Sequence, residues 1–144
     1  MKLAAVRIRG RRKLAPDITD TMNMMNLNRA NHCVLIEDTP QNLGMLQKCK
    51  DYVAYGPVDG ATVEGLLKKR GERGGKMLRD VMEGAEIKEA ANKIMHGESV
   101  KNFADPVFRL HPPRKGYRDI KKPFGDGGEL GKRDGMDSLI RRMM

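Results

Sequence analysis

The sequence is poor in aromatic residues. Of its 144 residues, three are tyrosine, three are phenylalanine and none is tryptophan. A hydrophobic core must therefore be built from aliphatic side chains and from the 11 methionines, which fill irregular gaps in protein interiors. The length is sufficient for one compact domain, which at this size buries roughly two thirds of its unfolded surface.

Cysteine is also scarce. Cys33 and Cys49 are the only two, and they do not form a C-x-x-C pair. The three histidines are scattered without the spacing of a metal site. We therefore expect the two thiols to act as small apolar side chains in a reducing compartment, with no metal and no cofactor.

Long apolar runs are absent. The longest, Cys33–Ile36, is far shorter than the roughly twenty residues that a membrane-spanning helix needs. Arg7 interrupts the apolar stretch near the N-terminus, which is unlike a signal peptide. We expect a cytoplasmic protein without a membrane partner.

The recognisable signatures of enzymes are missing. The segment Lys69–Lys76 superficially resembles a phosphate-binding loop, but its glycine spacing is wrong and Met77 follows the lysine where Ser or Thr is needed. We expect a linker between helices there. No serine lies in a nucleophile elbow, and Asp126 and Glu129 have no base beside them in the sequence. The chain is predicted to have no enzymatic activity and no small-molecule substrate.

Positive charge is plentiful, with 28 Lys and Arg against 19 Asp and Glu. Such a balance favours a polyanionic partner, and basic loops and tails suit the irregular surfaces of RNA. Tyr117 is expected to stack on an unpaired base. The residues predicted to bind RNA are Arg7, Arg9, Arg11, Arg12, Lys13, Arg29, Arg114, Lys115, Tyr117, Arg118, Lys121, Lys122, Arg141 and Arg142.

The N-terminal part alternates strand and helix patterns. Leu3–Arg9 alternates near its end as a half-buried strand does, and His32–Glu37 is apolar enough for a central strand. Pro16 and Thr39-Pro40 are typical helix starts, and Tyr52–Tyr55 indicates a third strand. The predicted class is α/β, as a two-layer α+β sandwich. Its small three-stranded sheet has the order β-α-β-α-β, and two helices cover one face.

The remainder divides into two further segments. Residues 59–101 read as helical, with one helix over Asp59–Arg70 that ends at Gly71 and a second over Lys76–Met95 that is broken near Gly84. Residues 102–144 form a basic, Gly/Pro-rich extension, with a strand within Phe103–Leu110 and a short terminal helix. The predicted division is therefore residues 1–58 as an RNA-binding core, 59–101 as a helical segment and 102–144 as the extension.

The C-terminal extension has an unusual composition. Between Arg109 and Gly135 there are eight Lys or Arg, four Asp or Glu and nine Gly or Pro. So few large apolar side chains are not expected to offset the entropy cost of ordering the segment. We therefore predict that the extension is either disordered or held by a partner outside the chain.

Nearly the whole chain resembles a known family, with only Gly71–Lys101 loosely matched, and two parts carry the resemblance most clearly. The segment Met25–His32 (MNLNRANH), followed by Val34–Glu37 and Asp38–Pro40, is similar to the signature region of the large-subunit ribosomal protein family L-thirty. The tail Phe108–Met144, with RLHPPRKGY and GDGGELGKRDGMDSLIRRM, resembles the longer archaeal form, akin to eukaryotic L-seven.

The resemblance implies a structural component of the large ribosomal subunit. Expected partners are large-subunit ribosomal RNA and neighbouring ribosomal proteins, and archaeal relatives also lie near 5S RNA. Two alternatives are weighed against this function. A free RNA-binding regulator or chaperone would bind many RNAs weakly, and a small RNA-processing enzyme would need a carboxylate or histidine cluster that the sequence does not show.

Overall fold

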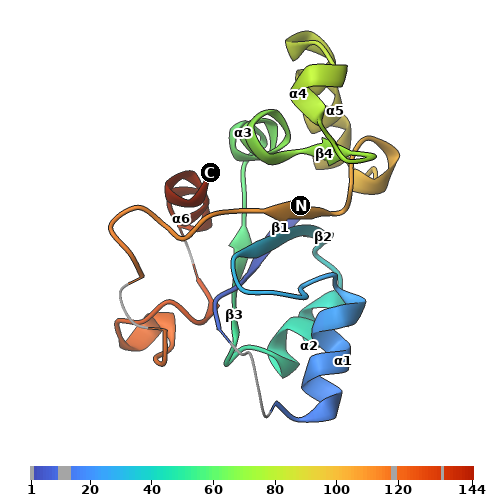
Figure 1. Ribbon diagram of the computed structural model, residues 1–144. Coiled ribbons are helices and arrows are strands. Elements are labelled where there is room, and N and C mark those ends of the chain that lie inside the picture. Colours follow the sequence, from blue (N-terminus) through green and yellow to red (C-terminus); the bar gives the residue numbers. More distant parts are fainter. Residues whose placement is uncertain (1, 10–13, 118–119, 134) are drawn as a thin grey trace.

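The computed structural model describes residues 2–9, 14–117, 120–133 and 135–144, and its centre is a mixed β-sheet (Figure 1). Five strands pair in the order β6-β2-β1-β3-β7. All pairings are antiparallel except that of β3 with β7. The strands are β1 (Lys2–Arg7), β2 (His32–Glu37), β3 (Val53–Pro57), β6 (Val107–Arg109) and β7 (Gly131–Lys132).

Six α-helices and a small hairpin complete the fold over the described residues. The hairpin joins β4 (Glu72–Arg73) to β5 (Lys76–Met77), and Gly74 and Gly75 both have positive φ values, +58° and +84°, at its turn. Glycine adopts this conformation without strain, so the two-residue turn is easily formed. The helices are α1 (Pro16–Met24), α2 (Pro40–Lys48), α3 (Gly60–Arg70), α4 (Leu78–Val81), α5 (Gly84–Met95) and α6 (Met136–Met143).

The local helix signals of the sequence are confirmed. Pro16 begins α1, and the Thr39 side chain caps α2 by accepting a hydrogen bond from the Asn42 N–H at 3.2 Å. Asp59 caps α3 in the same way, with 2.8 Å between its carboxylate and the Thr62 N–H. That bond is the main reason why the pKa of Asp59 lies below its usual range.

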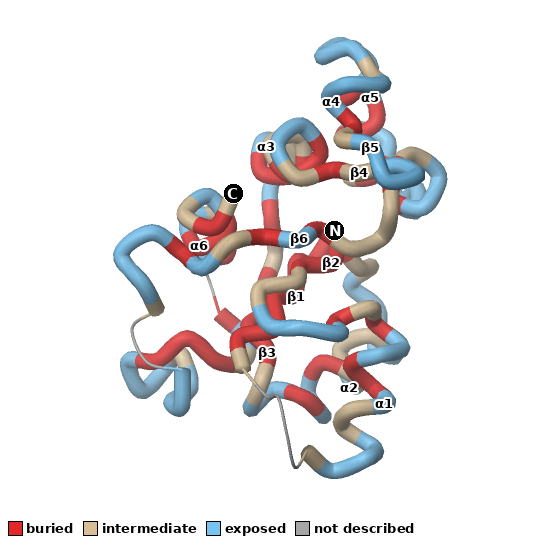
Figure 2. Tube along the Cα trace, viewed as in Figure 1, coloured by how far each residue is buried: buried red, intermediate tan, exposed pale blue. Residues whose placement is uncertain are grey.

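Helices cover both faces of the sheet. Leu3 and Ala5 of β1 pack toward α1 and α2, whereas Ala4 and Val6 pack toward α3, α5 and α6. Figure 2 shows the strands as a buried layer between these two sets of helices. The predicted α/β class is confirmed. The prediction that helices cover only one face of the sheet was wrong. All six residues of β1 are buried, because residues after position 59 return to the sheet and cover its second face.

Strand β1 is the centre of the sheet, since it pairs with β2 on one edge and with β3 on the other. The strand predicted to be central, His32–Glu37, is β2, which lies next to the central strand β1 in the sheet. An apolar run reports burial on both faces and does not report position in the sheet. The cysteines are buried on opposite faces, as expected for small apolar side chains, and burial raises the pKa of Cys33 to about 12 and that of Cys49 to about 11.

Residues 72–77 also differ from the sequence prediction. They form the β4–β5 hairpin, so the second helical stretch begins at Leu78 and not at Lys76. Gly84 begins α5 and so marks the predicted break. The boundaries of the three predicted segments stay a prediction. All three segments contribute residues to one buried hydrophobic cluster, which includes Ala4, Leu66 and Leu139.

The C-terminal extension is part of the fold, so the prediction that it lacks sufficient apolar burial was wrong. Strands β6 and β7 extend the sheet at both edges, and Phe108 of β6 is fully buried. The helix α6 buries Met136, Leu139, Ile140 and Met143. Each such side chain contributes roughly 2 kcal/mol of transfer free energy. Together these buried side chains offset the ordering entropy of the glycine-rich loops between them.

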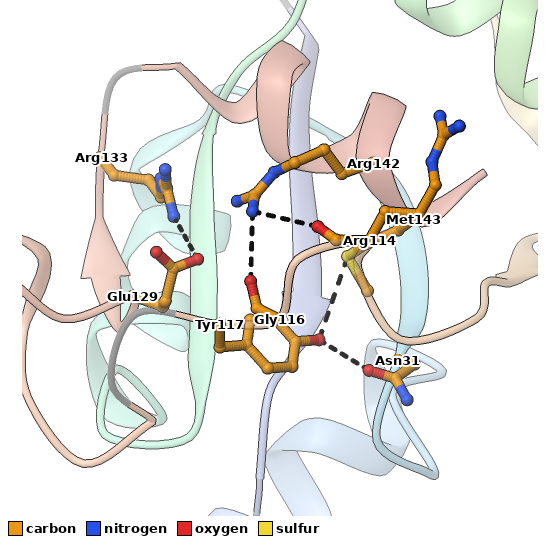
Figure 3. A network of polar contacts seen from close by, with 8 residues as sticks. All are labelled: Asn31, Arg114, Gly116, Tyr117, Glu129, Arg133, Arg142 and Met143. Atoms are coloured by element: carbon orange, nitrogen blue, oxygen red, sulfur yellow. Dashed lines mark hydrogen bonds and ion pairs between the residues drawn. The ribbon is translucent and has the colours of Figure 1, made fainter.

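A buried ion pair fixes the segment before α6. The Glu129 carboxylate accepts a hydrogen bond from the Arg133 guanidinium at 3.0 Å, and both side chains are buried (Figure 3). The guanidinium also lies 4.5 Å from the centre of the Phe124 ring, a cation–π distance. The Arg133 N–H donates to the Tyr55 carbonyl of β3 at 2.9 Å. A Cβ on Gly56 would lie 2.1 Å from the Arg133 carbonyl oxygen, so this close approach requires glycine.

A second set of contacts orders residues 111–117. The Tyr117 hydroxyl donates to the Asn31 side-chain oxygen at 2.6 Å, and the Arg142 guanidinium donates to the Gly116 carbonyl at 3.1 Å. The Arg114 N–H donates to the Arg142 carbonyl at 2.9 Å. Figure 3 shows the Arg142–Gly116 and Tyr117–Asn31 bonds, which connect the turn to α6 and to the loop before β2. The turn is therefore held by the chain itself.

We predict that Glu129→Ala lowers the free energy of unfolding by about 3 kcal/mol, because it removes the carboxylate from the buried Glu129–Arg133 ion pair. Urea denaturation followed by circular dichroism measures the change. The matched control is Glu89→Ala on α5, which removes an exposed ion pair with Lys93 and should cost less than about 0.5 kcal/mol. Equal effects of the two substitutions would contradict a stabilising role for the buried pair.

We predict that Tyr117→Phe lowers the free energy of unfolding by about 1 kcal/mol, since it removes the hydrogen bond to Asn31 and keeps the ring. Amide hydrogen exchange should also become faster at Gly116. The control is Tyr52→Phe, which keeps the ring that Arg9 contacts and removes a hydroxyl that forms no hydrogen bond with the described residues. An unchanged exchange rate at Gly116 would show that the Tyr117–Asn31 bond does not order the turn.

Candidate nucleic-acid interface

The strand directions bring the basic segments together at one end of the sheet. Strands β1 and β6 end where β2 and β3 begin, because β1 is antiparallel to both and β6 is antiparallel to β2. Arg9 follows the end of β1, Arg29 precedes the start of β2, and Arg109 is the last residue of β6. We call this the basic end of the sheet.

The basic end includes one cation that the sequence analysis missed. Arg109 lies directly opposite His32 in the β2–β6 register, and its side chain is exposed although it pairs with Glu72 at 2.8 Å. The surroundings lower the pKa of His32, first through burial and then through the charges of Arg109, Arg29 and Arg7. Only the strand register could have identified Arg109, since three-residue strands carry almost no periodic signal.

The Arg7 side chain is buried and bonds to the protein backbone. It is 6% exposed, and its guanidinium donates to the Leu27 carbonyl at 2.9 Å beneath the turn that follows α1. Burial lowers the pKa of Arg7 from its usual value. An RNA contact predicted from its place in a charge run is therefore not supported by its geometry.

Arg9 and Arg29 lie nearer the surface. The half-exposed Arg9 guanidinium lies 5.2 Å from the centre of the Tyr52 ring and donates to the Asp51 carbonyl at 3.0 Å. Arg29 is exposed in the turn between α1 and β2. That turn is shaped by Asn26 and Asn31, which have φ values of +63° and +67°. Asparagine tolerates this left-handed conformation better than most residues.

The turn at residues 114–117 presents two exposed cations. Lys115 and Gly116 have φ values of +68° and +73°, and the Arg114 and Lys115 side chains are exposed. Because Tyr117 is bonded to Asn31, this turn lies beside the Arg29 turn although the two are far apart in the sequence. The structure thus joins two of the predicted basic clusters into one surface.

Tyr117 itself faces inward. Its ring packs against the buried cluster around α6, and its hydroxyl is engaged with Asn31. Burial raises the pKa of the Tyr117 hydroxyl, and the Glu129 carboxylate adds to the effect. Stacking on a base would require the ring to leave these contacts, so the structure favours a positioning role for this residue.

The other predicted residues are distributed differently. Lys121 and Lys122 are exposed, and Lys121 lines a cleft of about 280 Å³ with Lys50 and Asp51, which adjoins the basic end. Arg141 lies 3.9 Å from the Asp59 carboxylate, beyond the opposite end of β3, whereas Arg142 holds the 114–117 turn. Arg11, Arg12, Lys13 and Arg118 lie outside the described residues.

The chemistry available at the basic end is anion binding. Exposed guanidinium and ammonium groups on ordered turns neutralise phosphates and fix the orientation of a nucleic acid. Among the described residues no group of three or more His, Cys, Asp or Glu side chains is suited to a metal ion. The described helices are all too short or too polar to span a membrane.

Comparison with known proteins agrees with this chemistry. The family model of ribosomal protein L30p/L7e matches residues 3–53. A protein of Methanococcus maripaludis named large ribosomal subunit protein uL30 is 47% identical, with 100% of both chains covered. Its counterpart from Methanothrix thermoacetophila is 41% identical over 97% of this chain and 98% of that one, and the one from Methanoregula boonei is 47% identical over 89% and 90%.

These alignments extend far beyond the 3–53 segment and include the extension that completes the sheet. The resemblance found in the sequence is thereby confirmed. A match of 47% identity that covers the whole of both chains shows common descent of the whole chain. The chain therefore belongs to the ribosomal protein L30p/L7e family.

Proposed function

We propose that this chain is a structural component of the large ribosomal subunit that binds folded ribosomal RNA through the basic end of its sheet. The single observation that carries the RNA-binding surface is the junction of the Arg29 turn with the 114–117 turn through the Tyr117–Asn31 hydrogen bond. The family of large-subunit ribosomal proteins supports the location in the ribosome and a role without enzymatic activity.

The RNA-facing residues of this proposal are Arg29, Arg114 and Lys115, with Arg9, Arg109 and Lys121 at their margins. The first three are exposed, and the backbone that carries them is fixed by hydrogen bonds within the chain. Binding therefore costs little ordering entropy for the backbone. These side chains contact phosphates of any sequence, so specificity arises from the shape into which the RNA folds.

Tyr117 and Arg142 act as positioning residues in this proposal. Arg142 donates to the Arg114 and Gly116 carbonyls, at 3.4 and 3.1 Å, so its guanidinium is directed at the protein backbone. The proposal also includes proximity to 5S RNA, for which the family resemblance is the only support. Chemical footprinting of 5S RNA in subunits with and without this chain tests that part.

The alternative of a free RNA-binding regulator is distinguished by sedimentation. In a sucrose gradient of a cell extract at high salt, a structural component stays in the large-subunit peak in a fixed ratio to the RNA. A free regulator moves to the top of the gradient or spreads over many particles as salt rises.

We predict that Arg29→Gln combined with Lys115→Gln weakens binding to a large-subunit ribosomal RNA transcript. Filter binding between 50 and 300 mM KCl should show that the slope of log affinity against log salt falls in magnitude by about 1.5 to 2, because two phosphate contacts are lost. The free energy of unfolding should stay within about 0.5 kcal/mol of the parent, since both side chains are exposed.

The matched control is Lys69→Gln combined with Lys88→Gln, two exposed lysines on α3 and α5. It makes the same change in net charge on two helices that carry none of the proposed RNA-facing residues. If RNA responds only to the overall charge of the chain, the two double variants will bind with equal weakness, and the proposed surface is then wrong.

A further inference from the structure

The cleft of about 280 Å³ lies between the turn before β3 and the segment that leads into β7. We call it the lysine cleft. Its volume is close to the lower limit of ligand pockets in proteins, about 300 Å³, so it has room for one small planar group and not for a double helix. The lining residues that matter here are Lys50, Asp51, Lys121, Phe124, Gly125 and Lys132.

The charges that line the lysine cleft favour an anion. Of the lining residues, three are lysines and one, Asp51, is a carboxylate, and all four are exposed. The Arg9 guanidinium lies beside them, because it donates to the Asp51 carbonyl at 3.0 Å. Cations around a concave surface raise the local concentration of anions. The cleft is therefore a continuation of the basic end of the sheet.

The lysine cleft also has an apolar part. Pro123, Leu130 and the half-buried Phe124 line it. The Arg133 guanidinium lies 4.5 Å from the centre of the Phe124 ring and covers one face of it, so a planar ligand would stack on the other face. A bare phosphate needs no such surface and is repelled by the Asp51 carboxylate. A nucleotide has a phosphate for the lysines, an aromatic base for the ring and, on most bases, amino groups that donate to a carboxylate.

The backbone around the lysine cleft is fixed by the chain itself. The Phe124 N–H donates to the Leu130 carbonyl at 2.9 Å, and the Gly128 N–H donates to the Pro123 carbonyl at 2.9 Å. The segment lies beside β3 (Figure 1), where β7 pairs with β3 and places Gly131 opposite its second residue. Binding at this cleft would therefore order little additional backbone.

We propose that the lysine cleft binds one unpaired nucleotide of the RNA, with its base against Phe124 and its phosphates near the three lysines. This inference rests on the proposed function and deepens it, because it assigns a single-stranded feature of the RNA to a surface that elsewhere contacts only phosphates. Unpaired bases that are turned out of a loop or bulge are the features of RNA that proteins stack on aromatic side chains. The stacking expected of Tyr117, which faces the core, is thereby assigned to Phe124.

The first test is an NMR titration of the full ¹⁵N-labelled chain with the single-stranded RNA pentanucleotide A5. We expect saturable shifts at the Asp51, Gly125 and Gly131 amides. An oligomer of five abasic ribose phosphates should bind at least about tenfold more weakly, because it has the phosphates and lacks the bases that stack. Equal binding of the abasic oligomer would overturn the proposal.

The peptide pentaglutamate serves as a second control, since it is a polyanion that contains no base. We expect it to bind at least about tenfold more weakly than A5. If pentaglutamate binds as tightly as A5 and shifts the same three amides, the cleft is a site for an acidic protein segment, and the nucleotide proposal is wrong.

Gly125→Leu tests the location by filling the cleft. Gly125 lines the cleft and has no positive φ, and a Cβ there would meet no atom within 4 Å, so we expect the variant to melt at the parent temperature. It should bind A5 at least about tenfold more weakly, because the base loses its place. The matched control is Gly84→Leu at the start of α5, which is equally open and exposed and should keep the parent affinity. Parent affinity for A5 in Gly125→Leu would overturn the assignment.

A second variant removes charge in place of space. Lys50→Gln combined with Lys132→Gln should weaken A5 and lower the magnitude of its salt slope by about 1.4, since two phosphate contacts to a single strand are lost. Both lysines are exposed, so the fold should be unaffected. An unchanged salt slope in this variant would show that the lysines do not contact the phosphates, and would also overturn the proposal.

The large-subunit ribosomal RNA transcript separates this inference from the proposed function. Gly125→Leu should weaken the transcript about tenfold with an unchanged salt slope, because no cation is lost. If only the Arg29 and Lys115 variant weakens the transcript, the nucleotide site is wrong and the proposed RNA-binding surface stands. If only Gly125→Leu weakens it, the nucleotide site stands and the surface built on the two turns is wrong.

Discussion

Strand β1 is buried on both faces and paired on both edges, and the arrangement of the other elements follows from this burial. Alternate residues of one strand must face opposite sides, so Leu3 and Ala5 require one covering layer and Ala4 and Val6 require another. The segment up to β3 supplies only α1 and α2. Residues beyond 59 must therefore return to the sheet, which explains why α3, α5 and α6 are integral to the structure.

This return also orders the proposed RNA-binding surface. Docking α6 against the second face positions Arg142, whose hydrogen bonds hold the 114–117 turn. Docking Tyr117 against the same cluster aligns that turn with the Arg29 turn through Asn31. Apolar burial thus sets the spacing of cations that themselves make few contacts. The hydrophobic core and the proposed RNA-binding surface are coupled because the same C-terminal extension contributes to both.

Much of the first half of this fold was predictable because its signals are local. Thr39-Pro40 marks the start of α2, Asp59 caps α3 and Gly71 ends it, and each signal lies within four residues of the feature it specifies. The strand predicted within Phe103–Leu110 is confirmed as β6, whereas β7 escaped prediction because two residues carry no measurable periodicity. The Tyr117–Asn31 bond joins residues 86 positions apart. No spacing rule in a single sequence predicts such a pair.

At the candidate site too, the charges could be predicted from the sequence, whereas the positions of the charged side chains could not. The number of cations in the sequence predicts an anionic partner, and the structure leaves Arg29, Arg114 and Lys115 exposed. The number of cations could not distinguish these exposed residues from Arg7, which lies under a turn, or from Arg142, whose guanidinium donates to backbone carbonyls. A guanidinium has five donors and serves folded backbone as readily as phosphate. The strand register and the burial of each side chain decide which partner each arginine meets.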